Sequence, residues 1–382
     1  MTTSTTEETA VAAETMFMPA PQAMVESALR AGCQLFCAYP ITPVEDMTEY
    51  WLKRVPDFPG ALSFIPESEL ESGNMMYGFA AAGKRVAFAS TRAGMSLIHE
   101  AMGMIMGAEL PCVLFNFPRA GGLSISQADY NVATKAPSHG DEKMFVLAPM
   151  GTQEAVDLTR EAFYLADKFR NAVMIMADYT LGLTMEVVEF KPLDESDLPE
   201  KDWALTGDRT REARRSLAMA ASGGVTAANM ATGVDETVGT ISGPEKSAWR
   251  RHAKYQSFEP RAELTHLDDA EAAGVAYGTV ARMILPVLER LREAGHRVGM
   301  IRPITLYPFP SDVINEASGR MRLGVIECNT GQMVDDVRLA AQSSAAVEFY
   351  GRPGGAAPSP DEIEGELLRL LSSANSSSEG TA

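Results

Sequence analysis

Three carboxylates, spaced two residues apart at a predicted helix start, are the side chains of this sequence best placed for proton chemistry. Glu67, Glu69 and Glu71 lie in the segment IPESELESGNMMYGFAAAG, residues 65–83. Ser68 and Glu71 have the spacing of a helix capping box, in which both side chains bond backbone amides at the helix start. Acidic side chains there also complement the helix dipole, so these carboxylates have a structural interpretation beside the catalytic one.

Three further segments, punctuated by Gly and Pro, follow short apolar runs as loops follow the strands of a sheet. They are YPITPVED after Ala38, STRAG from Ser90, and FPRAGGLSISQADY after Asn116. In parallel sheets ligands bind at the carboxyl ends of the strands. We therefore expect the binding site in these loops.

Metal chemistry within this chain is not predicted. The four cysteines, Cys33, Cys37, Cys112 and Cys328, have the spacing of neither a zinc site nor an iron–sulfur cluster. We expect buried, reduced thiols.

The elements that carry these loops divide the chain into two α/β units. Residues 18–190 alternate helical patterns with short apolar runs, which predicts a parallel sheet covered on both faces. Residues 191–265 are charged and Gly/Thr-rich and are predicted to be a linker or interface arm with one helix at 245–258. Residues 266–372 form a second α/β unit, and 1–17 and 373–382 are predicted disordered tails.

Composition excludes several classes of partner. The chain has 382 residues, 46% of them hydrophobic, and a net charge of −18, which argues against nucleic acid and against anionic membrane surfaces. It has no apolar run of membrane-spanning length, and its acidic N-terminus is unlike a secretory signal. We expect a cytoplasmic protein.

The loops carry a pattern that resembles a known enzyme family, the α subunit of the thiamine diphosphate-dependent 2-oxoacid:ferredoxin oxidoreductases. The segments that carry the resemblance in the first half are AYPITPVED (38–46), PESE around Glu69, AELPCVLFNFPRAGG (108–122) and SQADYNVATKAPSHGD (126–141). Those in the second half are AYGTVARM (276–283), GMIRPITLYPFP (299–310), IECNTGQMVDDVRLA (326–340) and EFYGRPGG (348–355). The SQADY…ATK…HGD run most resembles the 2-oxoisovalerate (3-methyl-2-oxobutanoate) branch.

The resemblance implies a fold and a division of labour. Residues 18–190 would be the pyrimidine-binding domain of thiamine enzymes, and 266–372 a transketolase C-terminal-like domain. A β subunit would carry the diphosphate and magnesium site, and γ and ferredoxin-like subunits or domains would carry iron–sulfur clusters. The implied reaction turns a 2-oxoacid and coenzyme A into acyl-CoA and CO2 with ferredoxin as acceptor, and this chain would be catalytic only with its partners.

The resemblance also assigns roles to residues around the cofactor. Glu69 would bond the aminopyrimidine ring of thiamine diphosphate and favour the tautomer whose neighbouring nitrogen is a base. Pro40, Ile41 and Gly94 would line the cofactor. Glu67 and Glu71 keep their capping role.

Two residues are implied in substrate binding. Arg119 would hold the carboxylate of the oxoacid through two hydrogen bonds of its planar guanidinium. Thr42 would meet the carboxylate or the keto oxygen through its hydroxyl.

The sequence departs from the family pattern at Thr91-Arg92-Ala93-Gly94, where many relatives have Ser or Thr and Pro before the glycine. Arg92 either brings a second cation to the pocket, which suits a dicarboxylic acid such as 2-oxoglutarate, or points to solvent. The loop after Arg119 is also shorter than is common. The alternatives are therefore the 2-oxoglutarate, pyruvate or aryl-glyoxylate branch, a non-catalytic scaffold subunit, or a transferase that uses the same cofactor without redox chemistry.

Overall fold

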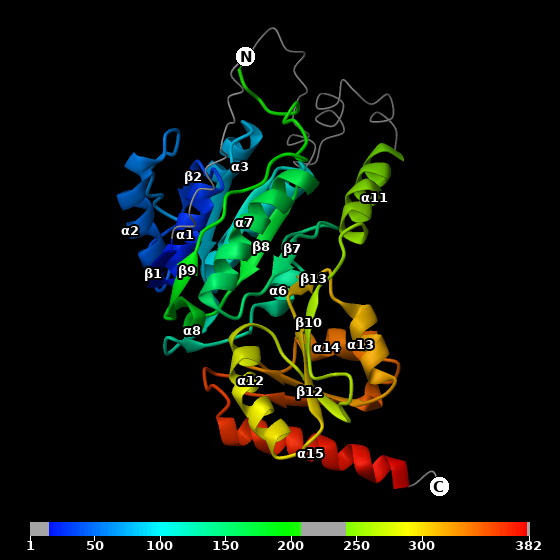
Figure 1. Ribbon diagram of the computed structural model, residues 1–382. Helices are drawn as coiled ribbons and strands as arrows, with labels where there is room; N and C mark the ends of the chain where they lie inside the picture. Colours follow the sequence, from blue (N-terminus) through cyan, green and yellow to red (C-terminus); the bar gives the residue numbers. More distant parts are fainter. Residues whose placement is uncertain (1–14, 208–241, 380–382) are drawn as a thin grey trace, which may run out of the picture.

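The computed structural model describes residues 15–207 and 242–379. Figure 1 shows two α/β units, one coloured blue to green and the other yellow to red. The predicted tails at 1–14 and 380–382, and the predicted arm over 208–241, lie outside the described residues.

A six-stranded sheet in the order β13-β7-β8-β4-β3-β2 forms the centre of the first unit. Its strands are β2 (Leu35–Cys37), β3 (Val86–Ser90), β4 (Cys112–Asn116), β7 (Phe145–Leu147), β8 (Ala172–Met176) and β13 (Thr305–Tyr307). All are parallel except β13, which pairs antiparallel with β7. The strands are apolar along most of their length because successive side chains enter two different cores: Phe88 lies in one cluster, and Ala87 and Ala89 in the other.

Helices cover both faces of this sheet (Figure 1). The helices are α1 (Ala20–Arg30), α2 (Glu45–Arg54), α3 (Glu69–Ala81), α4 (Ala93–Leu97), α5 (His99–Gly107), α6 (Tyr130–Thr134), α7 (Thr152–Phe169) and α8 (Tyr179–Gly182), with a 3-10 turn at Val55–Asp57. The buried side chains of α1, α2 and α7 belong to one core cluster, whereas those of α3 and α5 belong to the other. The predicted parallel sheet covered on both faces is confirmed.

Two small antiparallel ladders flank the sheet. One joins β1 (Thr15–Pro19) to β9 (Met185–Glu189), and the other is a hairpin of β5 (Arg119–Ala120) and β6 (Ser124–Ile125). The hairpin follows β4 directly and therefore lies at the carboxyl end of the central sheet, where the loops predicted to bind a ligand also lie.

The second unit has a five-stranded sheet in the order β10-β12-β11-β14-β15. Its strands are β10 (Ala262–Thr265), β11 (Ala272–Val275), β12 (Val298–Pro303), β14 (Arg322–Glu327) and β15 (Val347–Gly351). Its helices are α12 (Gly278–Glu293), α13 (Ser311–Ser318), α14 (Met333–Ala340) and α15 (Pro360–Glu379), with a 3-10 turn at Ser344–Ala346. Core residues of α12 and α15 pack on one face, and those of α13 and α14 on the other.

The structure differs from the predicted division of the chain in four places. Strand β10 belongs to the sheet of the second unit, although its residues were predicted to lie in the linker. Strand β13 follows β12 of the second unit but joins the sheet of the first, so the two units share a strand. Strand β1 begins at Thr15, and α15 continues to Glu379, beyond residue 373 where a tail was predicted to begin. The helix predicted at 245–258 is present as α11 (Ser242–Gln256).

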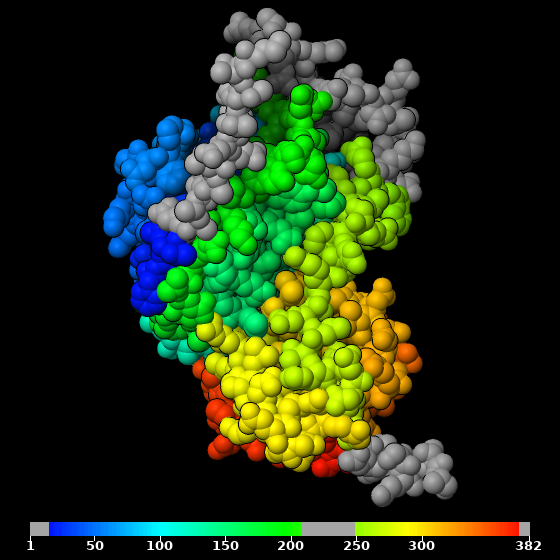
Figure 2. Space-filling view, in the orientation of Figure 1, coloured from blue at the N-terminus to red at the C-terminus, as the bar shows by residue number. Residues whose placement is uncertain are grey.

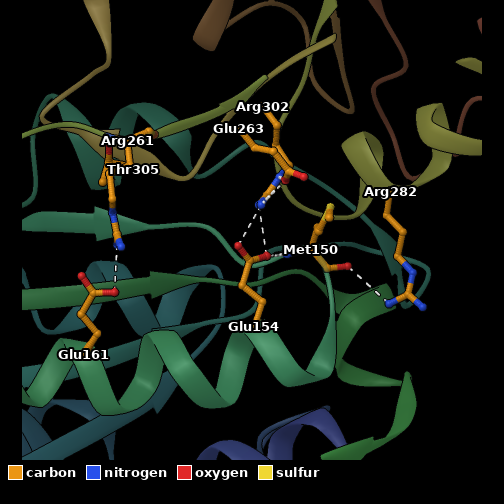
Figure 3. A network of polar contacts seen from close by, with 8 residues as sticks. All are labelled: Met150, Glu154, Glu161, Arg261, Glu263, Arg282, Arg302 and Thr305. Carbon is orange, nitrogen blue, oxygen red and sulfur yellow. Dashed lines mark hydrogen bonds and ion pairs between the residues drawn. The ribbon is translucent and has the colours of Figure 1, made fainter. Parts of the chain in front are cut away.

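Charged side chains brace the junction between the units, which are in contact along the face shown in Figure 2. Arg302 of β12 is 3% exposed and binds Glu154 of α7 through two nitrogens, at 2.9 and 3.1 Å. Its Nε also donates to Glu263 of β10 at 2.7 Å (Figure 3). A buried guanidinium needs such partners because desolvating an unpaired charge is costly.

Candidate active site

Glu69 is the first residue of α3, and the structure separates it from the two carboxylates that flank it. The Ser68 hydroxyl caps the helix by accepting a hydrogen bond from the backbone amide of Glu71 at 3.2 Å. The Glu71 carboxylate in turn accepts a hydrogen bond from the backbone amide of Glu67 at 2.5 Å. Such caps contribute about 1 kcal/mol to helix stability. The capping role expected of Glu71 is therefore confirmed, although its carboxylate binds the amide of Glu67 and not the amide of the cap residue Ser68. Glu67 does not cap through its side chain, which is exposed.

The Glu69 carboxylate is instead buried, with the residue 8% exposed. It lies against the end of β3, where the Ser90 hydroxyl donates to Glu69 Oε1 at 3.4 Å. A hydrogen bond of that length is weak. The carboxylate therefore keeps acceptor capacity for another donor.

Gly94, the second residue of α4, completes the walls around this carboxylate. A Cβ added at Gly94 would overlap Glu69 Oε1 and Ser90 Oγ and would lie 3.1 Å from Glu69 Cδ. Only glycine allows the backbone to approach so closely. The structure thus brings together Glu69 and Gly94, two of the residues that the sequence assigned to one site.

Arg92 precedes α4 and is exposed. A Cβ added at Gly121, in the turn of the β5–β6 hairpin, would lie 3.8 Å from Arg92 Nη1. The end of the Arg92 side chain therefore lies near the turn of the hairpin that carries Arg119. The role of Arg92 in substrate binding stays a prediction.

Arg119 begins that hairpin and is half-buried. Its Nε is buried and has no hydrogen-bond partner within the described part of the chain. An unpaired buried guanidinium nitrogen costs free energy. A ligand carboxylate is the kind of group that would pair with it.

The second unit also contacts this hairpin. A Cβ added at Gly355 would overlap Ser124 Oγ of β6 and would lie 2.8 Å from the Cβ of Ala120. The RPGG loop after β15 thus packs on the hairpin, a contact that sequence reasoning did not predict.

Thr42 lies in the loop between β2 and α2, beside the half-buried Ile41 and the exposed Pro40. Its hydroxyl donates to Glu45 Oε1 at 2.6 Å. Pro43 packs against α8, because a Cβ added at Gly182 would come 2.9 Å from Pro43 Cγ. The structure gives Thr42 a partner in its own segment, and its predicted contact with substrate stays a prediction.

The SQADY segment, which the sequence singled out for its resemblance, fastens the two units together. The side-chain oxygen of Gln127 accepts a hydrogen bond from the backbone amide of Cys328 at 2.8 Å, and its side-chain nitrogen donates one to the carbonyl of Tyr277 at 3.1 Å. Tyr130 donates to Asp336 Oδ2 at 2.6 Å. These hydrogen bonds between the segment 126–130 and the second unit, here called the latch, were not predicted from the sequence. The feature that could have indicated them is the pair of polar motifs at 126–141 and 326–340, each of which interrupts a largely apolar stretch.

The four cysteines are buried and free, as predicted. Burial raises the pKa of Cys112 and of Cys328 to about 12. These thiols are therefore protonated at neutral pH and unsuited to metal binding or nucleophilic attack. Within residues 15–207 and 242–379, no group of His, Cys, Asp and Glu side chains could hold a metal ion, and no helix is long and apolar enough to cross a membrane.

Sequence comparisons identify relatives over most of the chain. Residues 26–239 match the model of the pyruvate flavodoxin/ferredoxin oxidoreductase thiamine diphosphate-binding domain, and residues 270–363 match pyruvate:ferredoxin oxidoreductase core domain II. Ketoisovalerate oxidoreductase subunit VorB of Methanothermobacter thermautotrophicus is 37% identical over 87% of this chain and 91% of its own. 2-Oxoglutarate synthase subunit KorA of Archaeoglobus fulgidus is 31% identical over 91% of this chain and 97% of its own.

Solved structures show the same fold. The 2-oxoglutarate:ferredoxin oxidoreductase from Magnetococcus marinus superposes with a TM-score of 0.79 at 20% identity, over 94% of this chain and 65% of that one. A split-gene transketolase superposes with a TM-score of 0.54 at 12% identity, over 92% of this chain and 96% of that one. The expected thiamine-enzyme fold is confirmed, and the chain belongs to the thiamine diphosphate-dependent 2-oxoacid:ferredoxin oxidoreductase family.

Proposed function

We propose that this chain supplies the aminopyrimidine-binding half of the active site in a multi-subunit 2-oxoacid:ferredoxin oxidoreductase. The complex decarboxylates a 2-oxoacid oxidatively and transfers the acyl group to coenzyme A. The observation that carries the proposal is the Glu69 carboxylate, which is buried against Gly94 and, among the described residues, accepts only a long hydrogen bond from Ser90. A non-catalytic scaffold would have no need of a glycine cradle around an under-bonded carboxylate.

When bound, thiamine diphosphate supplies a carbanion at C2 of its thiazolium ring, which is the nucleophile toward a 2-oxoacid. Glu69 binds the ring nitrogen of the aminopyrimidine and shares a proton with it, which makes the exocyclic nitrogen a base. Gly94 leaves room beside the Glu69 carboxylate, and we assign Pro40 and Ile41, in the loop after β2, to the lining of the cofactor.

Arg119 binds the carboxylate of the oxoacid. Its buried Nε, which has no hydrogen-bond partner among residues 15–207 and 242–379, lies at the carboxyl end of β4, where a ligand reaches the edge of a parallel sheet. Thr42 adds a hydroxyl on the β2 side of the same edge by exchanging its bond to Glu45 for one to the substrate.

A branched-chain 2-oxoacid is the substrate that the 37% identity to a ketoisovalerate oxidoreductase subunit supports. The placement of Arg92 beside the Arg119 hairpin favours one second candidate, 2-oxoglutarate, whose distal carboxylate a second cation would bind. Assaying the complex with both acids, before and after Arg92→Ser, separates them. Loss of 2-oxoglutarate turnover alone assigns Arg92 to the distal carboxylate, whereas unchanged discrimination removes it from the pocket.

A partner β subunit carries the diphosphate and magnesium site. Large apolar side chains that are exposed in the loop after β2, in the segment that leads into α3 and in α3 itself support this. These are Tyr39, Leu62, Phe64, Ile65 and Leu70, between 43 and 58% exposed. An apolar patch of this kind marks an interaction surface. Electrons leave through iron–sulfur clusters in γ and ferredoxin-like subunits, and ferredoxin accepts them.

The test is to purify the tagged chain from its native host and to measure thiamine and iron in what accompanies it. We expect a brown complex that contains thiamine diphosphate and reduces ferredoxin with a 2-oxoacid and coenzyme A. A colourless lone chain that binds no thiamine when candidate β subunits are added would contradict the proposal. Thiamine without iron would instead indicate a transferase.

A further inference from the structure

The β5–β6 hairpin that carries Arg119 is too short to hold its shape alone. Its strands form two residue pairs, Arg119 with Ile125 and Ala120 with Ser124. An isolated two-stranded hairpin is at best marginally stable in water, even at ordinary strand length. The orientation of the Arg119 side chain therefore depends on what packs against the hairpin.

The first unit holds the start of the hairpin. The backbone amide of Tyr179, the first residue of α8, donates to the carbonyl of Pro118 at 3.1 Å. Pro118 directly precedes Arg119, so this bond anchors the hairpin where the chain leaves the central sheet. The returning strand β6 has its own anchors, and they lie in the second unit.

One of these anchors is the side chain of Ile125. It is 3% exposed and belongs to a core cluster whose other buried members, from Ala272 to Leu371, all come from the second unit. Side chains alternate along a strand and directly paired residues share a face, so Ile125 and Arg119 lie on the same face of the hairpin. The second unit therefore seats the residue directly opposite Arg119.

The other face of the hairpin, formed by Ala120 and Ser124, meets the backbone of Gly355. A Cβ added at Gly355 would overlap Ser124 Oγ and would lie 2.8 Å from Ala120 Cβ. The hydroxyl can rotate away, but the Ala120 Cβ is fixed to its backbone, so the hairpin itself would have to move. The second unit thus holds the hairpin from both faces.

The end of β6 is held by the second unit as well. Two residues beyond Ile125, the backbone amide of Gln127 donates to the carbonyl of Cys328 at 3.1 Å, beside the side-chain bonds of the latch. Strand β6 is therefore bound to the second unit, whereas the residue before β5 is bound to the first. The two pairs of the hairpin join these anchors.

We propose that Gly355 is a positioning residue for the oxidoreductase reaction: with the seat of Ile125 it lets the second unit grip the hairpin and hold Arg119 toward the oxoacid carboxylate. The group so presented is the buried Arg119 Nε, which has no hydrogen-bond partner within residues 15–207 and 242–379. This inference rests on the proposed function, because it takes Arg119 as the carboxylate ligand. It gives the second unit a role in substrate binding without contact to the substrate.

The loop contains a matched control for this proposal. Gly354 has φ 78° and Gly355 has φ 96°, so alanine at either position is strained by its backbone conformation. A Cβ added at Gly354, however, would meet nothing within 4 Å. Only Gly355→Ala presses on the hairpin, and the difference between the two variants removes the effect of strain.

The experiment compares Gly355→Ala with Gly354→Ala in the complex assembled with its partner subunits. The readouts are KM and kcat for a 2-oxoacid and the hydrogen exchange of backbone amides in residues 119–125. We expect Gly355→Ala to raise KM about tenfold, because a small misplacement of a binding group weakens its contact, and to change kcat less than threefold. It should also speed amide exchange, whereas Gly354→Ala should change each readout less than twofold.

Two backgrounds show whether the effect passes through this contact and through Arg119. Ala120→Gly with Ser124→Ala removes the two atoms that the new Cβ would strike, so Gly355→Ala should then raise KM less than threefold. Arg119→Lys already weakens the carboxylate contact, so Gly355→Ala should add less than threefold there, because changes at one contact do not multiply. If Gly355→Ala prevents assembly, assembly restored by the first background supports the grip equally.

The proposal is overturned if Gly354→Ala and Gly355→Ala have equal effects, or if Gly355→Ala is as harmful in the Ala120→Gly/Ser124→Ala background, including failure to assemble in both. It is also overturned if amide exchange speeds while KM stays unchanged, or if the KM effects of Gly355→Ala and Arg119→Lys multiply. Hydrogen exchange detects the grip without turnover. A complex that shows the exchange difference but turns over no 2-oxoacid would contradict the proposed function and not the grip.

Discussion

Gly94 touches the carboxylate of Glu69 so closely that a methyl group at position 94 has no room. An added Cβ would overlap Glu69 Oε1 and stand 3.1 Å from Cδ. The two residues come from different elements, α4 and α3, and are 25 positions apart in the chain. Their contact forms the floor of the proposed aminopyrimidine site.

Gly94→Ala should therefore displace the Glu69 carboxylate. We expect kcat to fall by about 100-fold, since small misplacements of a catalytic group have effects of that order. Steady-state kinetics of the assembled complex measure it. The matched control is Gly78→Ala in α3, where an added Cβ meets nothing within 4 Å; it should keep activity and stabilise the helix by about 0.5–1 kcal/mol.

Glu69→Gln should abolish turnover while leaving the complex assembled. A glutamine keeps the shape of the side chain but cannot share a proton, and acid–base groups contribute about 10²–10⁴-fold to rate. The comparison is Glu67→Gln, an exposed carboxylate two residues away, which should change kcat less than twofold. Full activity of Glu69→Gln would refute the proposed mechanism.

Arg119→Lys should weaken oxoacid binding. Lysine keeps the positive charge but loses the planar pair of donors, so we expect KM to rise about tenfold with a smaller change in kcat. Kinetics over a range of oxoacid concentration test this. Equal effects from Arg320→Lys, a surface arginine in the second unit, would mean that the change is unspecific.

Tyr130→Phe should loosen the junction between the two units. The hydroxyl of Tyr130 donates to Asp336 in a buried setting, and removing such a bond costs about 1–2 kcal/mol. Thermal unfolding of the purified chain should show the loss. Tyr164→Phe, whose hydroxyl bonds Asp197 at the surface, is the control and should change stability by less than about 0.5 kcal/mol.

Glu109 should make the docking of α11 sensitive to acid. Burial alone would raise its pKa, but Lys254 and Arg250 of α11 outweigh burial and lower the pKa from 4.5 to about 2. Because the folded pKa is depressed, the stabilisation is complete above about pH 4.5 and is lost as the pH falls toward 2.

Glu109→Gln tests that dependence. Breaking a buried ion pair costs roughly 3 kcal/mol, so the variant should unfold at a lower temperature at pH 6. The difference from wild type should shrink as the pH is lowered through 4 toward 2. A difference that stays constant with pH would show that the carboxylate charge is not what holds α11.

The sequence alone determined the fold class and the residue that centres the site. Apolar runs such as residues 86–89 specify strands buried on both faces, and the Ser68 cap fixes where α3 begins, because both depend on neighbours in the chain. The family pattern in the loops depends on residue identity, so it too could be read without coordinates.

Tertiary structure decided which of these loops meet. Arg92 comes near the turn of the Arg119 hairpin because the parallel pairing of β3 with β4 brings their carboxyl ends together. Gly94 reaches Glu69 because α3, which connects the parallel strands β2 and β3, begins at that same edge of the sheet. Two further contacts join residues about 150 to 200 positions apart: the hydrogen bond between Gln127 and Cys328, and the pairing of β13 with β7 in the first sheet. Such distant contacts are possible because the entropy cost of closing a loop rises only slowly with its length. No local pattern encodes such pairings, because their free energy arises from burial and hydrogen bonding between segments that meet only in the folded chain.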